Sequence, residues 1–229
     1  MMSGSSGSDE RPSTAAPRRS SEPLLSMRGI EKSFPGVRAL CGVDFDLYAG
    51  EVLALLGENG AGKSTLMKVL GGAIPADRGL LRLGDREVAF RSPQESRAAG
   101  IAVIHQEFNL VPGLTAVENI FLGQERAAVP RRSEERRRAA ELFARLGGTV
   151  DLDVPCRRLT TAQQQLVEIA RALAFDASVI VMDEPTAALT AAEAERLFEI
   201  VRDLRSRGIG VVFIGHRLDE IFAVADRVV

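Results

Sequence analysis

The chain of 229 residues contains no tryptophan, one tyrosine and two cysteines. So few aromatic side chains leave little material for stacking on nucleic-acid bases. Cys41 and Cys156 stand alone without metal-site spacing, which favours reduced structural thiols in a cytosolic chain over a disulfide scaffold. No uninterrupted apolar run approaches the roughly 18 residues of a membrane-spanning helix, so we expect no membrane span.

A large net charge is also missing. The formal net charge is −2 and the pI is about 5.9, so no overall positive field would attract nucleic acid or an anionic membrane. One basic run, Arg131–Arg138, is interleaved with Glu134 and Glu135, which favours a solvated helix face over the alternative of a nucleic-acid patch. We therefore expect no nucleic-acid partner.

The N-terminal stretch lacks the apolar core of a signal peptide and is rich in Ser, Gly, Pro, Arg and acidic residues. This composition predicts a disordered tail over residues 1–23 and one ordered domain over residues 24–229. At the other end, Arg227 to Val229 begins a further strand with no cap, helix or tail after it. We expect the domain to be truncated there.

The most informative segment present is residues 57–64, Gly-Glu-Asn-Gly-Ala-Gly-Lys-Ser. It matches the phosphate-loop pattern of Gly, four residues, Gly-Lys and then Ser or Thr. An apolar run at 52–56 predicts a buried parallel strand before it, and residues 64–70 predict a helix after it. The motif thus has the strand–loop–helix context that phosphate binding requires.

The spacing suits the triphosphate tail of a nucleotide. Gly57, Gly60 and Gly62 allow the backbone to curl so that N–H groups point at phosphate oxygens, and the helix start adds positive potential. Lys63 can reach the β- and γ-phosphates, and the Ser64 hydroxyl can ligate Mg²⁺. The alternative is a glycine-rich turn that only connects two elements, and the flanking strand and helix favour phosphate binding.

Hydrophobic patterning predicts an α/β fold with a largely helical middle section. We expect β-type structure at 24–34 and 39–48, a hairpin at 79–90 across Gly84-Asp85, buried strands at 101–104, 179–182 and 210–214, and helices at 93–99 and 191–207. From about Thr115 to Leu173 the pattern is almost wholly helical, with Ser133 capping one helix and another helix at 162–174.

An acidic pair, Asp183-Glu184, directly follows the apolar residues 179–182. A carboxylate at the end of a buried strand beside a phosphate loop is where Mg²⁺ needs a second protein contact, which favours Asp183. Glu184 can then polarise a water aimed at the γ-phosphate. The alternative is a pair of acids at an exposed strand end, and the phosphate loop in the same chain argues against it.

Two further polar side chains follow predicted strands in the same way. Gln106 can hold the water shell of the metal and an attacking water, and His216 can donate to the γ-phosphate. Taken singly, each is more often a polar residue at a strand end that only forms hydrogen bonds within the fold. Both, however, lie where open α/β sheets place ligands. His105 and His216 are the only histidines, and without a third ligand at suitable spacing we expect no metal site between them.

A hydroxyl-rich segment, Leu159-Thr160-Thr161-Ala162-Gln163, precedes the predicted helix at 162–174. Hydroxyls and free backbone N–H groups at a helix start can bind an anion. Equally, Thr160 or Thr161 can serve only as the N-cap of that helix. This motif alone leaves the two interpretations open.

In order and spacing, these motifs together resemble the nucleotide-binding subunit of an ABC transporter, over nearly all of residues 24–229. Walker A corresponds to 57–64, the Q-loop glutamine to Gln106, the signature motif to 159–163, Walker B to 179–184, the D-loop to 185–190 and the switch histidine to His216. Phe34 falls where an aromatic ring of the family stacks on adenine.

The resemblance implies a P-loop NTPase fold with a mainly parallel sheet core, an N-terminal antiparallel β subdomain and a helical subdomain at about 110–173. It implies ATP and Mg²⁺ as cofactors, with Glu184 as general base and with Gln106 and His216 positioning the γ-phosphate and water. The implied nucleotide contacts are Phe34, Gly57, Glu58, Asn59, Gly60, Ala61, Gly62, Lys63, Ser64, Thr65, Thr160 and Gln163. The implied metal contacts are Ser64, Gln106 and Asp183.

The local sequence at 105–110 and 184–190 resembles that of bacterial monosaccharide importers of the ribose, galactose and xylose type. That likeness implies a peripheral subunit on the cytoplasmic face of the bacterial cell membrane that uses ATP to energise sugar import. It implies permease subunits contacted through residues 107–123, a periplasmic sugar-binding protein, and a second nucleotide-binding half in the same longer polypeptide.

Two positions depart from the general family pattern. The signature Leu-Ser-Gly-Gly-Gln is Leu-Thr-Thr-Ala-Gln here, and Thr190 replaces the usual D-loop aspartate. One rival is therefore a regulatory module that binds ATP without turnover. Another is an ABC-type translation or DNA-repair factor, for which we would expect a basic surface or long inserted arms, and the sequence has neither.

Overall fold

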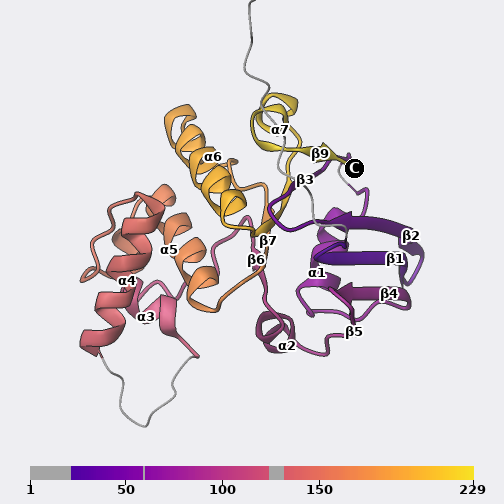
Figure 1. The fold of residues 1–229 in the computed structure, drawn as a ribbon, viewed down its shortest axis with the longest axis horizontal. Coiled ribbons are helices and arrows are strands. Elements are labelled where there is room, and N and C mark those ends of the chain that lie inside the picture. Colours follow the sequence, from indigo (N-terminus) through magenta and orange to yellow (C-terminus); the bar gives the residue numbers. More distant parts are fainter. Residues whose placement is uncertain (1–21, 59, 124–131) are drawn as a thin grey trace, which may run out of the picture.

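The computed structural model describes residues 22–58, 60–123 and 132–229. Almost all of the predicted disordered tail, together with Asn59 and Arg131, therefore lies outside the described residues. The fold has a central sheet with a helical part on one side and a second sheet on the other (Figure 1). The parallel and antiparallel sheets predicted from the sequence are both present.

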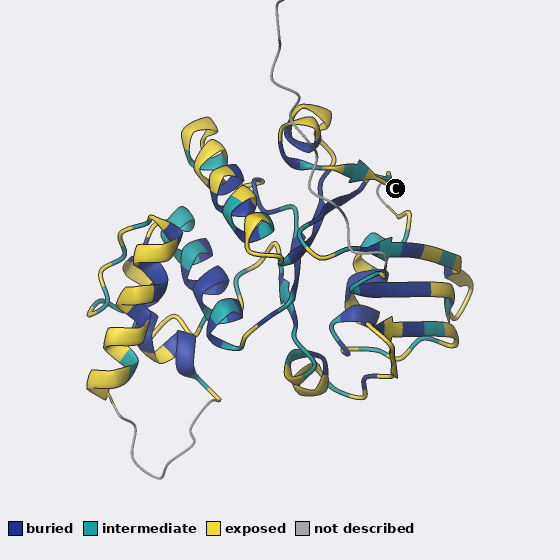
Figure 2. Cartoon of the chain, viewed as in Figure 1, coloured by how far each residue is buried: buried dark blue, intermediate teal, exposed yellow. Residues whose placement is uncertain are grey.

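The central sheet is parallel and has the order β6-β7-β8-β3-β9. Its strands are β3 (Val52–Leu55), β6 (Ile101–Ile104), β7 (Val179–Asp183), β8 (Gly210–Ile214) and β9 (Arg227–Val228). Every residue of β3 and β8 is buried, as expected of apolar strands covered on both faces (Figure 2). The predicted apolar runs are thus confirmed as the core of the sheet.

The second sheet is antiparallel with the order β2-β1-β4-β5. Its strands are β1 (Leu25–Phe34), β2 (Val37–Leu47), β4 (Arg78–Leu83) and β5 (Arg86–Val88). β4 and β5 form the predicted hairpin across Gly84-Asp85. Met27 and Phe45 from this sheet share a core with Met67 of α1 (Lys63–Leu70), which seats the sheet beside the phosphate loop.

The helical part consists of α3 (Ala116–Phe121), α4 (Arg132–Leu146) and α5 (Thr161–Ala174). Ile120, Phe143 and Ile169 bring these helices together in one buried cluster. The prediction that Ser133 caps a helix is wrong, because α4 already includes Arg132. Residues 147–155 form turns and irregular chain, so the pattern there overstated the helix.

Four further elements complete the described chain: α2 (Pro93–Ala98), the 3₁₀ turn η1 (Cys156–Arg158), α6 (Ala191–Ser206) and α7 (Leu218–Val224). A capping box starts α6, since Thr190 and Glu193 bond each other's backbone. None of the helices in the described part of the chain is long and apolar enough to cross a membrane.

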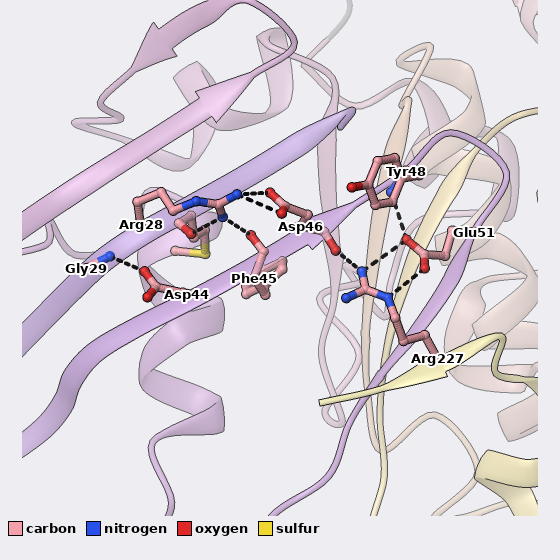
Figure 3. A network of polar contacts seen from close by, with 9 residues as sticks. Arg28, Gly29, Asp44, Phe45, Asp46, Tyr48, Glu51 and Arg227 are labelled. Atoms are coloured by element: carbon pink, nitrogen blue, oxygen red, sulfur yellow. Dashed lines mark hydrogen bonds and ion pairs between the residues drawn. The ribbon is translucent and has the colours of Figure 1, made fainter. Parts of the chain in front are cut away.

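A chain of ion pairs joins the two sheets at the end of β2 (Figure 3). Arg28 makes a two-pronged contact of 2.7 Å to each oxygen of Asp46. From β9 of the parallel sheet, the Arg227 guanidinium lies 2.9 Å from the buried Glu51 carboxylate and also bonds the Asp46 backbone oxygen. A buried carboxylate is costly without a partner, and Arg227 compensates Glu51. The bond of Arg227 to the Asp46 oxygen of β2 fastens β9 to the antiparallel sheet.

Candidate functional site

Four of the predicted site segments meet at one edge of the parallel sheet. β6, β7, β8 and β3 are neighbours that run in the same direction, so the loops that follow them emerge side by side. In register, Ile214 of β8 is paired with both Leu55 of β3 and Asp183 of β7. The sheet therefore places the phosphate loop, Asp183-Glu184, Gln106 and His216 along the same edge, as predicted for a ligand site.

The phosphate loop is held in a conformation that requires glycine. Gly60 and Gly62 both have φ near 92°, a left-handed conformation that side chains disfavour. At Gly62, the N-cap of α1, a Cβ atom would also collide with the carbonyl oxygen of Ala39 on β2. The Lys63 ammonium turns back into this loop, where it donates to the carbonyl oxygens of Gly57 and, at 3.0 Å, Glu58. The Lys63 ammonium is thus held against the backbone of the loop.

The two acidic residues at the end of β7 have different surroundings. Burial raises the pKa of Asp183, and the neighbouring Glu184 adds to this, whereas His105 and Lys63 act in the opposite direction. Glu184 has φ of 45°, uncommon for a residue other than glycine, and its N–H donates to the Ile214 oxygen at 2.9 Å. A backbone held in this conformation aims the side chain in a fixed direction.

The structure brings Glu184 and His216 together. The Glu184 Oε1 atom lies 3.4 Å from His216 Nδ1, with the glutamate side chain 23% exposed and the histidine side chain 59% exposed. Glu184 also lines a cavity of about 350 Å³ with Gln106, Thr161 and Gln165. The Glu184 carboxylate and the Gln106 amide therefore border one solvent-accessible space, and His216 contacts the carboxylate, so that these groups can orient a water molecule.

Thr160 and Gln163 occupy a helix cap. Thr160, not Thr161, is the N-cap of α5, and its hydroxyl accepts from the Gln163 N–H while the Gln163 side chain accepts from the Thr160 N–H. Gln163 also donates to the Thr149 oxygen at 3.4 Å. The cap is thus confirmed, and a nucleotide contact by either residue stays a prediction.

Phe34 ends β1 and is 44% exposed. The Lys32 ammonium lies 5.8 Å from the centre of its ring and 2.7 Å from an Asp77 carboxylate oxygen. Asp77 also accepts from the Ser33 N–H at 2.7 Å, which fixes the end of the strand. Phe34 is therefore an exposed ring on an anchored strand end, and stacking on adenine stays a prediction.

The donor set suits a magnesium ion that is bound largely by phosphate and water. Among the described residues, no group of three or more His, Cys, Asp or Glu side chains could by itself hold a metal. Mg²⁺ commonly uses one or two protein oxygens together with substrate phosphates. Ser64 at the first turn of α1 and Asp183 at the end of β7 supply two such oxygens, so the residues present fit this mode of binding.

One further acidic side chain was missed by the sequence prediction. Glu168 of α5 is buried and accepts from the Asn109 N–H at 2.9 Å, and Arg171 donates to the Asn109 oxygen at 3.2 Å. These bonds fasten the segment after Gln106 to α5. Burial raises the pKa of Glu168 to about 7. The signal in the sequence that could have indicated this buried carboxylate was the position of Glu168 between the apolar residues 167 and 169 of the same helix.

Replacing Glu168 by glutamine is expected to stabilise the fold at high pH. Since the folded-state pKa exceeds the ordinary value of 4.5, the folded chain binds more protons than the unfolded chain between pH 4.5 and 7. Stability therefore falls as pH rises through that window, by roughly 3 kcal/mol at most. Urea unfolding should show Glu168→Gln gaining stability over the parent at about pH 8, with little difference near pH 4.5.

Glu193→Gln is a matched control with the opposite sign. Hydrogen bonds from Thr190 lower the pKa of Glu193, so its contribution is present at high pH and disappears on acidification. The Glu193 variant should therefore be no more stable than the parent at about pH 8. If the free energy of unfolding of the two variants changed equally with pH, ionisation of the buried Glu168 carboxylate would not destabilise the fold.

Comparison with known proteins gives a consistent result. Residues 40–187 match the family model for the ABC transporter. The chain is 54% identical over 221 residues to ribose import ATP-binding protein RbsA 2 of Rubrobacter xylanophilus, covering 93% of this chain and 42% of that protein. It is 55% identical to ribose import ATP-binding protein RbsA 1 of Streptomyces avermitilis, covering 90% of this chain and 40% of the relative. The chain thus spans about two fifths of the length of these relatives.

Solved structures agree on the fold. A nucleotide-free ATP-binding cassette from an ABC transporter superposes with a TM-score of 0.80 at 30% identity, covering 89% of this chain and 85% of the other. A dimeric ATP-binding cassette bound to ADP and phosphate gives a TM-score of 0.78 at 26% identity, covering 90% and 93%. Motifs, sheet order, family match and relatives converge, and the chain belongs to the ABC transporter family.

Proposed function

We propose that this chain binds ATP with Mg²⁺, hydrolyses it, and thereby energises the import of a sugar across the bacterial cytoplasmic membrane. The observation that carries the proposal is the common sheet edge, where the glycine loop around Lys63 lies beside Asp183 and the Glu184–His216 pair. This common edge supports the proposal, because the proposed phosphate-binding groups and the proposed general base with its partner lie along it.

Each group has a distinct role in the proposed reaction. Backbone N–H groups of residues 57–64 and the Lys63 ammonium bind the phosphates and stabilise charge that develops on the γ-phosphoryl oxygens. Ser64 and Asp183, with Gln106, would hold Mg²⁺, which neutralises phosphate charge when bound. Glu184 takes a proton from the attacking water, and Gln106 and His216 orient the water and the γ-phosphate.

A complete site in this proposal needs a second nucleotide-binding half. The signature segment 159–163 lies at the start of α5, where its hydroxyls and N–H groups can face the phosphates of another half. The dimeric state of one solved relative supports such facing halves. Thr161 and Ala162 add side chains where the general family pattern has glycines. We therefore expect a composite site that uses this signature to hydrolyse ATP more slowly than one that uses the general family signature.

The printed names of the relatives, ribose import ATP-binding proteins, support a sugar as the transported substrate. We propose permease subunits as direct partners, a periplasmic sugar-binding protein acting through them, and a peripheral position on the cytoplasmic face of the membrane. Residues 107–123 are the proposed contact region. The bonds of Asn109 to Glu168 and Arg171 would pass movement of this region to α5.

Affinity purification of a tagged chain from its own solubilised cells tests the proposal. Polytopic permease subunits should be recovered with the protein, and deletion of its gene should abolish uptake of labelled ribose or a related monosaccharide. Recovery of ribosomes or DNA with no permease would instead support a translation or repair factor. Recovery of permease with ATP binding but without turnover would support the regulatory module.

A further inference from the structure

A buried carboxylate that contacts the segments next to the proposed catalytic pair has no role in the function described so far. Glu220 of α7 is 7% exposed. One of its oxygens accepts a hydrogen bond of 2.5 Å from the Thr186 hydroxyl, and the other lies 3.0 Å from the Arg217 guanidinium. Thr186 is itself buried. This is one carboxylate that contacts two different loops.

Those two loops carry the proposed catalytic pair. Thr186 follows Glu184 by two residues, in a turn closed by the bond from the Ala187 N–H to the Glu184 oxygen. Arg217 directly follows His216. Through the side chains of Thr186 and Arg217, Glu220 therefore connects the turn after Glu184 to the residue after His216.

The position of Glu184 needs such support. Its φ of 45° is a conformation that persists in a non-glycine residue only where the surroundings hold it. The backbone bond to Ile214 fixes the residue on the side of β8, and the Thr186–Glu220 bond fixes the turn that follows it. Loss of the second bond frees the turn to relax while the strands stay intact.

Ordinary helix capping does not account for Glu220. An acid in the first turn of a helix usually stabilises the helix start, as Glu193 does in α6 by bonding the Thr190 N-cap. In α7 the N-cap residue is Arg217, which has no side-chain capping bond, and the Glu220 carboxylate is directed to another loop. A carboxylate buried in this way is costly, and the ion pair with Arg217 and the bond from Thr186 compensate it.

We infer that Glu220 is a positioning residue that fastens the turn after Glu184 to the segment bearing His216. It thereby keeps the two proposed catalytic side chains at a fixed position relative to each other. This inference rests on the proposed ATP hydrolysis. It makes the Thr186–Glu220 pair a determinant of turnover and not of nucleotide affinity, since neither side chain is among those proposed to bind the phosphates.

A double-mutant cycle tests the inference. Glu220→Gln and Thr186→Val are each expected to lower kcat for ATP by about 10- to 100-fold, with KM within about twofold of the parent. Glu220→Gln removes the charge of the acceptor and the ion pair with Arg217, whereas Thr186→Val removes the donor. Because both act on the same bond, the double variant should be slowed by less than the product of the two single effects. Thr186→Ser keeps the hydroxyl and should retain parental turnover. The matched control is Glu193→Gln, which occupies the same helix position in α6 and should not change kcat.

A second readout is independent of turnover. The chain has two histidines, so the imidazole NMR signals of His216 can be assigned with a His105→Gln variant. Glu220→Gln should shift the His216 signals while the folded spectrum of the core is retained, and Glu193→Gln should leave them in place. If the parent fails to hydrolyse ATP and His216 still shifts, the proposed function is wrong and the positioning role stands. Unshifted His216 signals, or additive effects on kcat, would overturn the inference.

Discussion

Replacing Glu184 by glutamine is expected to reduce ATP turnover by about 10²- to 10⁴-fold while ATP still binds. Glutamine retains the shape of the side chain and an oxygen near His216, but it cannot accept a proton from the attacking water. Glutamate and glutamine have the same side-chain branching, so the left-handed backbone at residue 184 should be retained and the loss should report chemistry and not misfolding. Phosphate release by the complex with its permease subunits measures the rate, and calorimetric titration with ATP measures binding.

The control for this variant is Glu193→Gln, the same chemical change on the exposed start of α6. It should hydrolyse ATP at the parental rate. Parental turnover by Glu184→Gln would show that Glu184 is not the general base. In that case the Glu184–His216 contact would be structural, and another group bordering the same cavity would have to activate the water.

Replacing Lys63 by alanine has the second large effect, on affinity. A charge-assisted hydrogen bond to phosphate is worth about 1.5–3 kcal/mol, so we expect ATP to bind about 10- to 100-fold more weakly. In the structure the Lys63 ammonium already lies against the loop carbonyls, so little rearrangement is needed to reach the phosphates. Fluorescence titration with a labelled ATP analogue measures the change.

Lys68 provides the matched control, because it is an exposed lysine in the last turn of the same helix, α1. Lys68→Ala should bind ATP as the parent does, and circular dichroism should show both variants folded. Equal weakening by the two substitutions would mean that Lys63 acts only through the general charge of the helix and not through a phosphate contact.

Much of the fold was predictable because the informative signals are local. Parallel strands are buried on both faces, so residues 52–56, 179–182 and 210–214 appear in the sequence as continuous apolar runs. Polar residues that directly follow such runs must lie at one sheet edge, and this rule placed Asp183, Gln106 and His216 correctly relative to the sheet.

The parts that were not predictable depend on contacts between distant segments. The bond from Asn109 to Glu168 spans 59 residues and that from Thr186 to Glu220 spans 34, and no local pattern specifies either partner. The Ser133 cap was wrong for a related reason. A good capping residue was present, but the helix extends beyond it, and helix boundaries are the least certain feature of a sequence pattern.

Titration of the folded chain with ATP, in the presence and absence of Mg²⁺, tests the central claim most directly. The glycine loop, Lys63 and Asp183 predict saturable heat at one nucleotide per chain, with tighter binding when Mg²⁺ is present. Absence of saturable heat from folded protein under both conditions would contradict the account, because no proposed step can proceed without the bound triphosphate.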